Sequence, residues 1–542
     1  MRNIVLVCIL ILAAGVRLIG LSGNPPGIHS DEADIGYAAQ SVMETGRSQY
    51  GDGLGLVFHE FNGGLFPPIY SYVLVPFLWA GGLSIGSIRL PSAIFGVLSV
   101  ALLYFLMRTL CRRQGAALWA AFLLAVNPWH LYYSRQGRFE SIGIFFVLLG
   151  ALLFLAMGKR KGIGIMSAIS FGIAILANDA AKLFVPMFVP VLIWYHIVFK
   201  RTRLASLIPF FSVLLFFGVL MFGVLFVRGQ IKDFSRAGKA TSAEIAAQVD
   251  AERRHTLAPL WLSRVVHNKA TVLAKRYLVD YTKNFSLNWF FVEGHWNLQE
   301  SMGRHGQYLL FELPVFFLGL FVIFHSFTRA GVLLFLWMLL ANIPGAITQG
   351  DYYPYRSIFM LIPPLAFSAM GMDAWWAWVR RRPIRIRYLL MVGSTLAITT
   401  FVGSFLVTHF FDYPVYASEW RYKERTDMLR YALSVRNNYD SVFISGSPEF
   451  AVVAAVLDHT PAAVFQEAFR RPVSYKGKAF MQLGILWFGS IMEKDIVSPK
   501  SYFPRRSLIM VEGNTFASEL PIAEFRAASE PLRVVYKAFE VR

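Results

Sequence analysis

Paired carboxylates and a histidine lie close together in one short stretch of a chain that is otherwise apolar. The stretch GIHSDEADIGYAAQ follows the first apolar run and contains His29, Asp31, Glu32, Asp34 and Tyr37. A positioned carboxylate can take the proton of an attacking hydroxyl group, which makes it a general base. We therefore expect Asp31 and Glu32 to be catalytic, with Asp31 as the base, and the other three residues to contact the substrate.

A structural interpretation of the same residues stays open. Asp31 and Glu32 could cap a helix that runs through EADIGYAAQSVMETG, because Asp favours helix N-termini. This role does not exclude catalysis. Asp34 could lie on a solvated helix face, and Tyr37 could be an interfacial aromatic residue. The three carboxylates could also hold a divalent cation, which would need further carboxylates from other loops. The sequence indicates no other cofactor.

The composition places this stretch in a polytopic membrane protein. Of the 542 residues, 56% are hydrophobic and only 16% are charged, which is too apolar for a soluble domain of this length. The net charge of +19 comes from 52 Lys and Arg residues against 33 Asp and Glu residues. Because the basic residues cluster in short loops between apolar runs, we interpret them as a topology signal and expect no nucleic-acid partner. The two cysteines, Cys8 and Cys111, predict neither a disulfide nor a cysteine metal site.

Apolar runs predict about eleven transmembrane helices, since a spanning helix needs about 20 apolar residues. The predicted spans are 4–21, 90–107, 115–133, 139–157, 162–178, 183–199, 204–227, 308–325, 331–348, 356–376 and 388–410. The basic loops alternate, so they all fall on one side if the N-terminus is cytoplasmic, and the C-terminus is then extracytoplasmic. The apolar segment 66–82 is rich in proline and glycine, so we expect an interfacial or re-entrant helix there instead of a span.

Cationic side chains are predicted on the same side of the membrane as the acidic stretch. The transmembrane domain covers residues 1–410, and its large external loops are 22–89, which carries the acidic stretch, and 228–307. Charge at membrane depth is costly and usually faces a cavity or a partner, and guanidinium groups bind phosphate oxygens in pairs. The residues predicted to bind a lipid phosphate are Arg89, Arg135, Arg138, Lys182 and Arg356. Snorkelling of these side chains to headgroups is the alternative.

The last part of the chain, residues 411–542, is less apolar and predicts a small soluble α/β domain outside the membrane. Two β-rich runs, 441–446 and 507–513, each end at glycine. Residues 425–435 have the spacing of an amphipathic helix. Its location suggests that this domain recognises an acceptor or closes over the site.

Carboxylates beside a phosphate site suit the transfer of a sugar from a lipid phosphate. Such a sugar passes through an oxocarbenium-like transition state, and cations stabilise the departing phosphate. We find no P-loop, no G-x-G-x-x-G after a strand and no H-E-x-x-H. A transporter of lipid-linked glycans is the alternative, and it should carry ionisable residues along its spans, whereas 139–157, 204–227 and 388–410 have almost none. A glycan-binding scaffold is a third class, which would not need acidic and basic groups in one pocket.

Four sequence blocks resemble a known family of membrane glycosyltransferases. The blocks are SDEADIGYAAQSVMETG, PPIYSYVLVPF, IRLPSAIFGVLSVALLYFL and NPWHLYYSRQGRFES, and together they cover about residues 15–145. They resemble the GT-C class family that groups dolichyl-phosphate-mannose protein mannosyltransferases with bacterial aminoarabinose transferases, the glycosyltransferase family 39. The resemblance implies a GT-C fold with juxtamembrane helices in the first external loop. It also implies an inverting transferase with a polyprenyl-phosphate sugar donor and a site that faces outward.

The same resemblance assigns residues and leaves the acceptor open. The acidic pair of the family falls on Asp31 and Glu32, and its arginines fall on Arg89, Arg135 and Arg138. Part of the family has Lys before the Pro–Pro pair, where this chain has Phe66, so that contact is lost or moves to Lys182. The β-trefoil insert of eukaryotic protein mannosyltransferases is absent, so a glycan, lipid or protein acceptor remains open. We expect a multi-pass protein of the plasma (inner) membrane. The sugar and the oligomeric state are not indicated.

Overall fold

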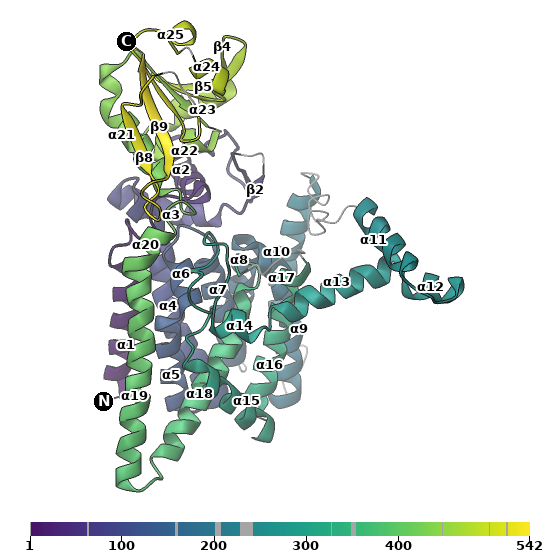
Figure 1. Cartoon of the computed structure of the whole chain (residues 1–542). Helices are drawn as coiled ribbons and strands as arrows, with labels where there is room; N and C mark the ends of the chain where they lie inside the picture. Colours follow the sequence, from purple (N-terminus) through teal and green to yellow (C-terminus); the bar gives the residue numbers. More distant parts are fainter. Residues whose placement is uncertain are drawn as a thin grey trace. The chain divides into compact units, whose positions relative to one another are not determined.

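The computed structural model describes the chain with several gaps (Figure 1). The described residues are 2–61, 64–157, 161–200, 207–227, 242–326, 328–347, 354–446, 448–497, 499–515 and 519–541. Part of the predicted external loop 228–307 therefore lies outside the described residues, at 228–241.

A helix lies at each predicted span. These helices are α1 Arg2–Leu18, α4 Ile85–Cys111, α5 Gln114–Val126, α7 Glu140–Ala156, α8 Lys161–Ala177, α9 Asp179–Lys200, α10 Ile208–Val227, α15 Glu312–Ser326, α16 Arg329–Ala341, α18 Ile362–Val379 and α19 Ile384–Val407. Among the described residues, five stretches are long and apolar enough to cross a membrane: Ile85–Cys111, Asp179–Phe199, Arg329–Ile347, Ile358–Val379 and Ile384–Tyr416. The count of eleven spans and their orientation stay predictions.

Contacts divide the described chain into two compact units. The first unit comprises Met1–Ala13, Val97–Leu131 and Ile142–Gly403, and the second comprises Ala14–Gly96, Tyr132–Ser141 and Ser404–Arg542. The second unit therefore combines the first predicted loop, a short segment before α7 and the C-terminal part of the chain. The predicted domain boundary at 410 stays a prediction, and the contacts place residues 404–410 with the C-terminal part.

The first unit is a helical bundle with an arm. Helices α15 and α18 pack closely, and small residues at the contact permit this, because a Cβ on Gly319 would lie 1.9 Å from the carbonyl oxygen of Phe367. The remaining short helices of the bundle are α6 Pro128–Ser134, which begins in this unit, α14 Leu287–Phe291, α17 Ile343–Ile347 and the 3₁₀ turn Ile358–Leu361.

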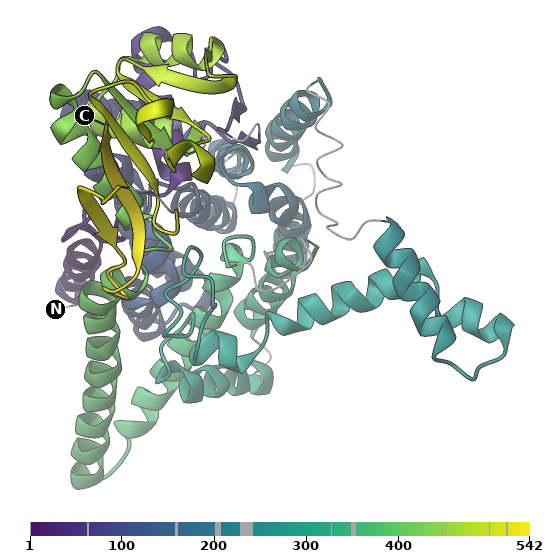
Figure 2. The same cartoon turned by 45° about the horizontal axis from the view of Figure 1, so that its top comes forward.

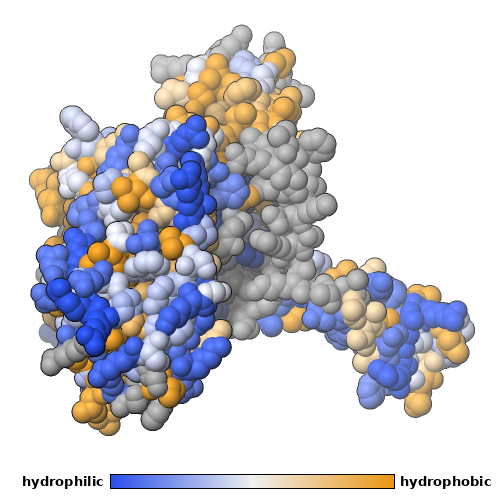
Figure 3. Space-filling view, turned by 90° about the horizontal axis from the view of Figure 1, so that it is seen from above, coloured by the Kyte–Doolittle hydropathy of each residue, from blue (hydrophilic) through white to orange (hydrophobic). Residues whose placement is uncertain are grey.

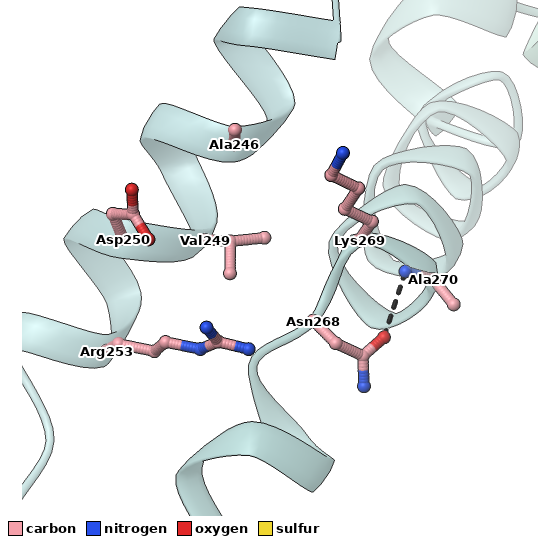
Figure 4. Close-up of a pocket in the computed structure, with 7 residues that line it drawn as sticks. All are labelled: Ala246, Val249, Asp250, Arg253, Asn268, Lys269 and Ala270. Atoms are coloured by element: carbon pink, nitrogen blue, oxygen red, sulfur yellow. Dashed lines mark hydrogen bonds between the residues drawn. The ribbon is translucent and has the colours of Figure 1, made fainter.

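The arm comprises residues 242–283, and Figure 2 shows it as three connected helices, α11 Ser242–Arg254, α12 Leu260–Val266 and α13 Lys269–Lys283. A small pocket lies between α11 and the start of α13 (Figure 4). There the side-chain oxygen of Asn268 accepts from the backbone N–H of Ala270 at 2.9 Å and caps α13. None of the residues predicted for the site lines this pocket.

The second unit contains two helices of the predicted juxtamembrane region, α2 Ser30–Thr45 and α3 Ile69–Gly81, and the short antiparallel pair β1 Phe58–His59 and β2 Leu65–Phe66. The expected helix at 66–82 is thus present, and its position relative to a membrane stays a prediction. Helix α2 packs against α3 and against α22 Pro448–Asp458 of the C-terminal part (Figure 1).

The C-terminal part of the second unit is a seven-stranded mixed sheet in the order β4-β5-β6-β3-β7-β9-β8. The strands are β3 Ser441–Ser445, β4 Val473–Tyr475, β5 Lys478–Leu483, β6 Leu486–Gly489, β7 Ser507–Glu512, β8 Ala523–Arg526 and β9 Val534–Val541. The helices around it are α20 Tyr413–Tyr416, α21 Lys423–Val435, α22, α23 Ala462–Arg470, α24 Glu493–Ile496 and α25 Pro499–Tyr502. The two predicted strands correspond to β3 and β7, which pair in parallel at the centre. Both are buried along nearly their whole length, as parallel strands covered on both faces are.

Candidate active site

The acidic stretch folds as the start of helix α2. The Nδ1 atom of His29 accepts from the backbone N–H of Asp31 at 3.2 Å, so His29 is the N-cap. Glu32 at the third helical position accepts from the backbone N–H of His29 at 3.2 Å, which completes a capping box. Of the two predicted capping residues, Glu32 therefore takes part in the cap through its side chain. The side chain of Asp31 points elsewhere, and 39% of it is exposed.

Glu32 is fully buried and accepts hydrogen bonds from several segments of the second unit. Arg89 donates through Nε at 2.9 Å and through Nη2 at 3.0 Å, and Arg421 donates through Nη2 at 3.1 Å. The backbone N–H of Gly137 donates at 2.8 Å. Burial alone would raise the pKa of Glu32, but the two guanidinium groups outweigh it and hold the pKa well below its usual range. Glu32 is thus an ionised anchor that solvent does not reach.

Arg89 donates all of its N–H groups to protein acceptors. Besides its bonds to Glu32, Nη1 donates to the carbonyls of Leu21 and Pro25 at 3.1 and 2.8 Å, and Nη2 donates to that of Gly27 at 2.8 Å. A guanidinium has five N–H donors, so this fully buried side chain has none left for a ligand. The geometry therefore favours a structural role for Arg89 over the predicted contact with phosphate.

Arg135 is likewise buried and bonded to backbone carbonyls. It donates to Val16 at 2.7 Å, to Ile19 at 2.9 Å and twice to Asn24 at 2.9 and 3.2 Å. Carbonyls at the end of a helix lack partners within it, and Arg135 supplies donors to those at the end of α1. This residue, too, is better suited to holding the first loop than to binding phosphate.

Arg138 is the predicted phosphate ligand that lies beside the exposed carboxylate. Its Nη1 atom is 4.0 Å from Oδ2 of Asp31, and its Nη2 atom is 3.4 Å from Oε1 of Glu140. The Nδ1 atom of His29 is 3.6 Å from the same Asp31 oxygen. Together, Asp31, His29 and Arg138 form what we call the Asp31 cluster, and Asp31 is its most exposed member.

The surroundings of the Asp31 cluster keep the aspartate ionised and the histidine neutral. Burial would raise the pKa of Asp31, but His29, Arg138 and Arg421 together lower it below its ordinary value, against the opposing charge of Glu32. Burial lowers the pKa of His29 to about 4, and Arg421 and Arg138 add to this effect while Asp31 opposes it. A neutral ring fits the Nδ1 atom of His29 as an acceptor.

Two predicted substrate contacts, Asp34 and Tyr37, are buried on α2 and bonded to the protein. Asp34 accepts from Gln49 Nε2 at 2.7 Å and from the Tyr50 hydroxyl at 3.0 Å, so it holds the loop that follows α2. Burial raises the pKa of Asp34 to about 8, although these donors lower it. The hydroxyl of Tyr37 donates to the carbonyl of Thr460 at 2.7 Å. The geometry therefore favours structural roles for both residues.

The remaining predicted phosphate ligands, Lys182 and Arg356, lie in the first unit. Lys182 pairs with Asp179 at the start of α9, and the guanidinium carbon of Arg356 lies 5.2 Å from the centre of the Tyr355 ring. Their contact with a phosphate stays a prediction.

Sequence reasoning missed two buried arginines of the C-terminal part, Arg421 and Arg425. Arg421 donates to Glu32 and, through Nη1, to the side-chain oxygen of Gln136 at 3.2 Å. Arg425 donates to the Ser30 hydroxyl and to the carbonyl of Ile28, each at 3.0 Å. Both lie in the segment RYKER, whose charge pattern is typical of a solvated helix start. No local signal distinguishes them from surface residues.

The predicted pair Asp31 and Glu32 does not fit a divalent cation. Both oxygens of Glu32 accept hydrogen bonds from guanidinium groups, which leaves one carboxylate where hard cations need several. Within the described residues, no group of three or more His, Cys, Asp or Glu side chains is arranged to hold a metal ion.

The fold is that of GT-C membrane proteins. ArnT from Cupriavidus metallidurans in the apo state superposes with a TM-score of 0.54 at 12% identity, over 98% of this chain and 97% of that one. The archaeal oligosaccharyltransferase AglB from Archaeoglobus fulgidus, in complex with an inhibitory peptide and a dolichol-phosphate, gives a TM-score of 0.51 at 11% identity, over 84% of this chain and 63% of that one. This protein is thus a multi-pass, mostly helical membrane protein with an ArnT-like fold and a C-terminal mixed sheet.

A family match confirms the resemblance predicted from the sequence. Residues 66–225 match the family described as dolichyl-phosphate-mannose-protein mannosyltransferase. The putative mannosyltransferase YycA of Bacillus subtilis (strain 168) is 28% identical over 139 residues. These residues are 26% of this chain and 20% of YycA, so the chain spans about a fifth of that relative.

Proposed function

We propose that this protein is an inverting glycosyltransferase that moves a sugar from a polyprenyl-phosphate donor to an extracytoplasmic acceptor. The acceptor hydroxyl oxygen bonds to the anomeric carbon of the sugar. The bond from that carbon to the phosphate oxygen breaks, and the polyprenyl phosphate leaves with the electron pair. Asp31 takes the proton of the hydroxyl group, so charge and atoms balance.

The observation that carries this proposal is the contrast between Asp31 and its neighbour. Asp31 is partly exposed and ionised beside Arg138, whereas Glu32 is buried and bonded to two arginines. A retaining mechanism needs two carboxylates that both reach the sugar, one as nucleophile and one as acid and base. A single accessible carboxylate suits one direct displacement, which inverts the anomeric carbon.

The properties of Asp31 also suit its role as base. A carboxylate with a low pKa is a weak base toward a free hydroxyl group, but the acidity of that group rises as its oxygen bonds to the sugar. Asp31 therefore takes the proton late, when the transition state already has oxocarbenium character. Arg138, whose Nη1 atom is 4.0 Å from Asp31, would bind the phosphate in this mechanism as negative charge develops on it. Arg89 and Arg135 hold the loop that carries Asp31.

The family match and the fold support the class of substrate. The matched family is named for dolichyl-phosphate-mannose as donor, and the AglB structure contains a dolichol-phosphate. A polyprenyl-phosphate sugar is the matching donor class for this chain. Its acceptor is a glycan, lipid or protein outside the cytoplasm.

Replacement of the base tests this function. Purified Asp31→Asn protein in detergent, with a radiolabelled polyprenyl-phosphate hexose and a panel of glycan, lipid and peptide acceptors, should transfer sugar about 10²- to 10⁴-fold more slowly than the wild type. Binding of the donor should change little. Asp440→Asn is the control, because Asp440 is an exposed aspartate of the C-terminal part that pairs with Arg506 at 3.3 Å, and it should keep wild-type turnover. Unchanged turnover in Asp31→Asn would contradict the role of Asp31.

The same assay separates the transporter from the enzyme. A transporter moves the intact lipid-linked sugar and leaves the bond to phosphate unbroken. If wild-type protein binds the donor but yields no free polyprenyl phosphate with any acceptor, the transporter is favoured and this proposal is wrong.

A further inference from the structure

Side chains of the C-terminal part form hydrogen bonds with the residues on both sides of Asp31. Arg421 donates to Glu32, and Arg425 donates to Ser30. The backbone N–H of Ile28 donates to the Thr426 hydroxyl at 3.2 Å. The two helical positions that flank Asp31 are thus fixed by side chains that lie almost 400 residues further along the chain. The side chain between them, that of Asp31, lies beside His29 and Arg138 instead.

The backbones of these two segments also approach closely. Gly27 has a φ of +65°, and a Cβ there would lie 2.6 Å from the carbonyl oxygen of Arg421, so only glycine fits. Tyr422 is a non-glycine residue with a φ of +56°, a conformation that the surroundings must impose. Its ring lies 5.4 Å from the ring of His29, and the guanidinium of Arg425 covers it at 4.2 Å. We call residues 421–426 the clamp segment.

Arg421 also links the segment that carries Asp31 to the segment that carries Arg138. Its Nη2 atom bonds to Glu32, the residue after Asp31, and its Nη1 atom bonds to Gln136, two residues before Arg138. Glu32 in turn accepts from Gly137. One buried guanidinium therefore fixes the separation of the base from the arginine opposite it.

We infer that Arg421 is a positioning residue for Asp31 and Arg138, and that the clamp segment is a required part of the reaction centre. This inference rests on the proposed function. It gives the C-terminal part a role in the chemical step, beyond the recognition of an acceptor. Misplacement of a reacting group by about 1 Å can cost about 100-fold in rate. We therefore expect Arg421→Gln to lower kcat by about that factor with little change in KM for the donor.

The test compares full-length variants in parallel. Arg421→Lys keeps a charge but cannot bond to Glu32 and Gln136 together, so it should recover only part of the lost kcat. Arg436→Ala is the matched control, because Arg436 pairs with Asp458 at 2.6 Å within the same sheet domain and lies outside the clamp segment. It should keep wild-type kcat.

Two further measurements do not follow from a general loss of stability. Arg421 helps to lower the pKa of Asp31, so the acid limb of the pH–rate profile should move to higher pH in Arg421→Gln and stay in place in Arg436→Ala. Hydrogen exchange of backbone amides 28–33 should rise in Arg421→Gln and stay at the wild-type level in Arg436→Ala. If kcat, acid limb and exchange are all unchanged, the inference is wrong. A wild-type protein without transfer activity contradicts the proposed function instead, and the exchange experiment still tests the clamp.

A different observation concerns the arm of the first unit. In α12 the polar Ser263 is buried at 6% exposure, whereas Leu260, Trp261 and Val265 are 73%, 68% and 63% exposed. Leu257, just before α12, is fully exposed. This is the reverse of the pattern on the surface of a soluble protein, and such apolar patches mark interaction sites. Figure 3 shows hydrophobic and hydrophilic residues side by side on the surface of the arm, at the right of the view.

The charge of the arm indicates its partner. Residues 242–283 contain seven Lys and Arg residues against four Asp and Glu residues. Helices with exposed Leu and Trp on one face and basic residues around it bind the surface of anionic bilayers. The arm is also held as one piece, because Arg253 of α11 donates to the carbonyl of His267 at 2.8 Å. We propose that the apolar face of α12 lies in the interface of an anionic bilayer.

Spin labels test this second proposal in the full chain. The only two cysteines, Cys8 and Cys111, are replaced by serine, and a label is attached at Trp261→Cys or, as matched control, at Leu532→Cys, where the native residue is 88% exposed on the sheet domain. In nanodiscs with anionic lipid, the label at 261 should collide several-fold more with oxygen and less with a nickel chelate than the control label.

Three outcomes would contradict the proposal that α12 lies in an anionic bilayer interface. Equal access of the nickel chelate to both labels places α12 in water. A label at 261 that is shielded from both reagents indicates a protein contact. Equal shielding in anionic and neutral bilayers contradicts recognition of anionic headgroups.

Discussion

At the scale of single residues, the site contains one partly exposed carboxylate next to a buried one. Asp31 and Glu32 are adjacent in the sequence, but Asp31 is partly exposed, whereas Glu32 is buried and surrounded by hydrogen-bond donors. Removal of one partner from a buried ion pair typically costs about 3–5 kcal/mol, because the other charge is left without compensation. Loss of activity in a Glu32 variant would therefore report on the structure and say little about catalysis.

The pH dependence of the Asp31 cluster is the prediction at this scale. His29, the N-cap of α2, and Glu32 of α2 face Asp31. Arg138 faces it from the loop before α7, and Arg421 and Arg425 face it from the C-terminal part. The pKa of Asp31 is lowered, so the base stays ionised until the pH falls through that lowered value. The pKa of His29 is lowered to about 4, so it stays neutral. We expect kcat/KM to be flat from about pH 8 to pH 5.5, with one acid limb below.

The stability of the N-terminal end of α2 should also decrease at acid pH. A histidine whose pKa is lower in the folded state than in the unfolded one stabilises the fold above the unfolded value, near 6.5. That contribution is lost as the pH falls through about 4. His29→Asn should keep the cap, because asparagine is a good N-cap residue, and it should remain active on the plateau. An inflection of the wild-type profile near pH 6.5 that disappears in this variant would contradict the prediction.

The sequence predicted which charged residues lie near one another better than it predicted their hydrogen-bond partners. The acidic pair and Arg138 were expected because their types and order carry a signal. Arg89 and Arg135 carried the same signal, yet their N–H groups bond to carbonyls of the first loop. A sequence shows that an arginine lies at a helix end, but the loop that folds over it is set by tertiary contacts.

At the scale of elements, helix α2 is held between α4 and the C-terminal part. Its face toward α4 needs a residue without a side chain, because a Cβ on Gly36 would lie 2.4 Å from Cδ1 of Ile88. Ile88 also contacts Gly137 so closely that a Cβ there would lie 2.5 Å from its Cγ2. Ile88 thus packs against two glycines, Gly36 of α2 and Gly137 next to Arg138.

Substitution of Gly36 tests this packing. Gly36→Ala should destabilise the protein by about 1–3 kcal/mol through overpacking. Gly86→Ala, a second helical glycine, should be neutral or stabilising by up to about 1 kcal/mol, because its Cβ would lie 3.7 Å from its nearest neighbour. The melting temperatures of the purified variants measure both effects. Ile88→Ala should restore tolerance of Gly36→Ala, and failure of this rescue would contradict the packing argument.

Most elements were predictable because each follows from a local pattern. Apolar runs predicted the long helices, the run 425–435 predicted α21, and glycine-terminated β-rich runs predicted β3 and β7. The other five strands of the sheet were missed, among them the two at its edges. β4 and β8 are short and half exposed, so they lack the apolar run that marks a buried strand.

At the scale of the whole molecule, the second unit couples the first loop to the C-terminal sheet. α2 packs on α22, and Gln466 of α23 donates to the hydroxyls of Ser41 and Thr45. The sequence suggested a separate soluble domain because composition changes near residue 411. Composition reports exposure to water, and it does not report which distant loop a domain folds against.

This coupling predicts that the loop and the sheet lose structure together. Phe443 is 1% exposed in the core of the sheet, and Phe443→Ala should destabilise that core by about 3–5 kcal/mol. Hydrogen exchange should then rise in α2 as well as in β3 and β7, since cooperative units open as one. Leu532→Ala, at an exposed turn, should change neither. Faster exchange in the sheet alone would contradict the coupling.

The bond between Arg421 and Glu32 joins positions 389 residues apart, which has a consequence for how the protein is made. At about 5–20 residues per second, a ribosome adds Arg421 roughly 20–80 seconds after Glu32. During that interval the nascent first loop has its acidic residues in place without their last guanidinium partner. If Arg421 positions Asp31 as we infer, a polypeptide released before residue 421 can insert its helices and still never turn over a substrate.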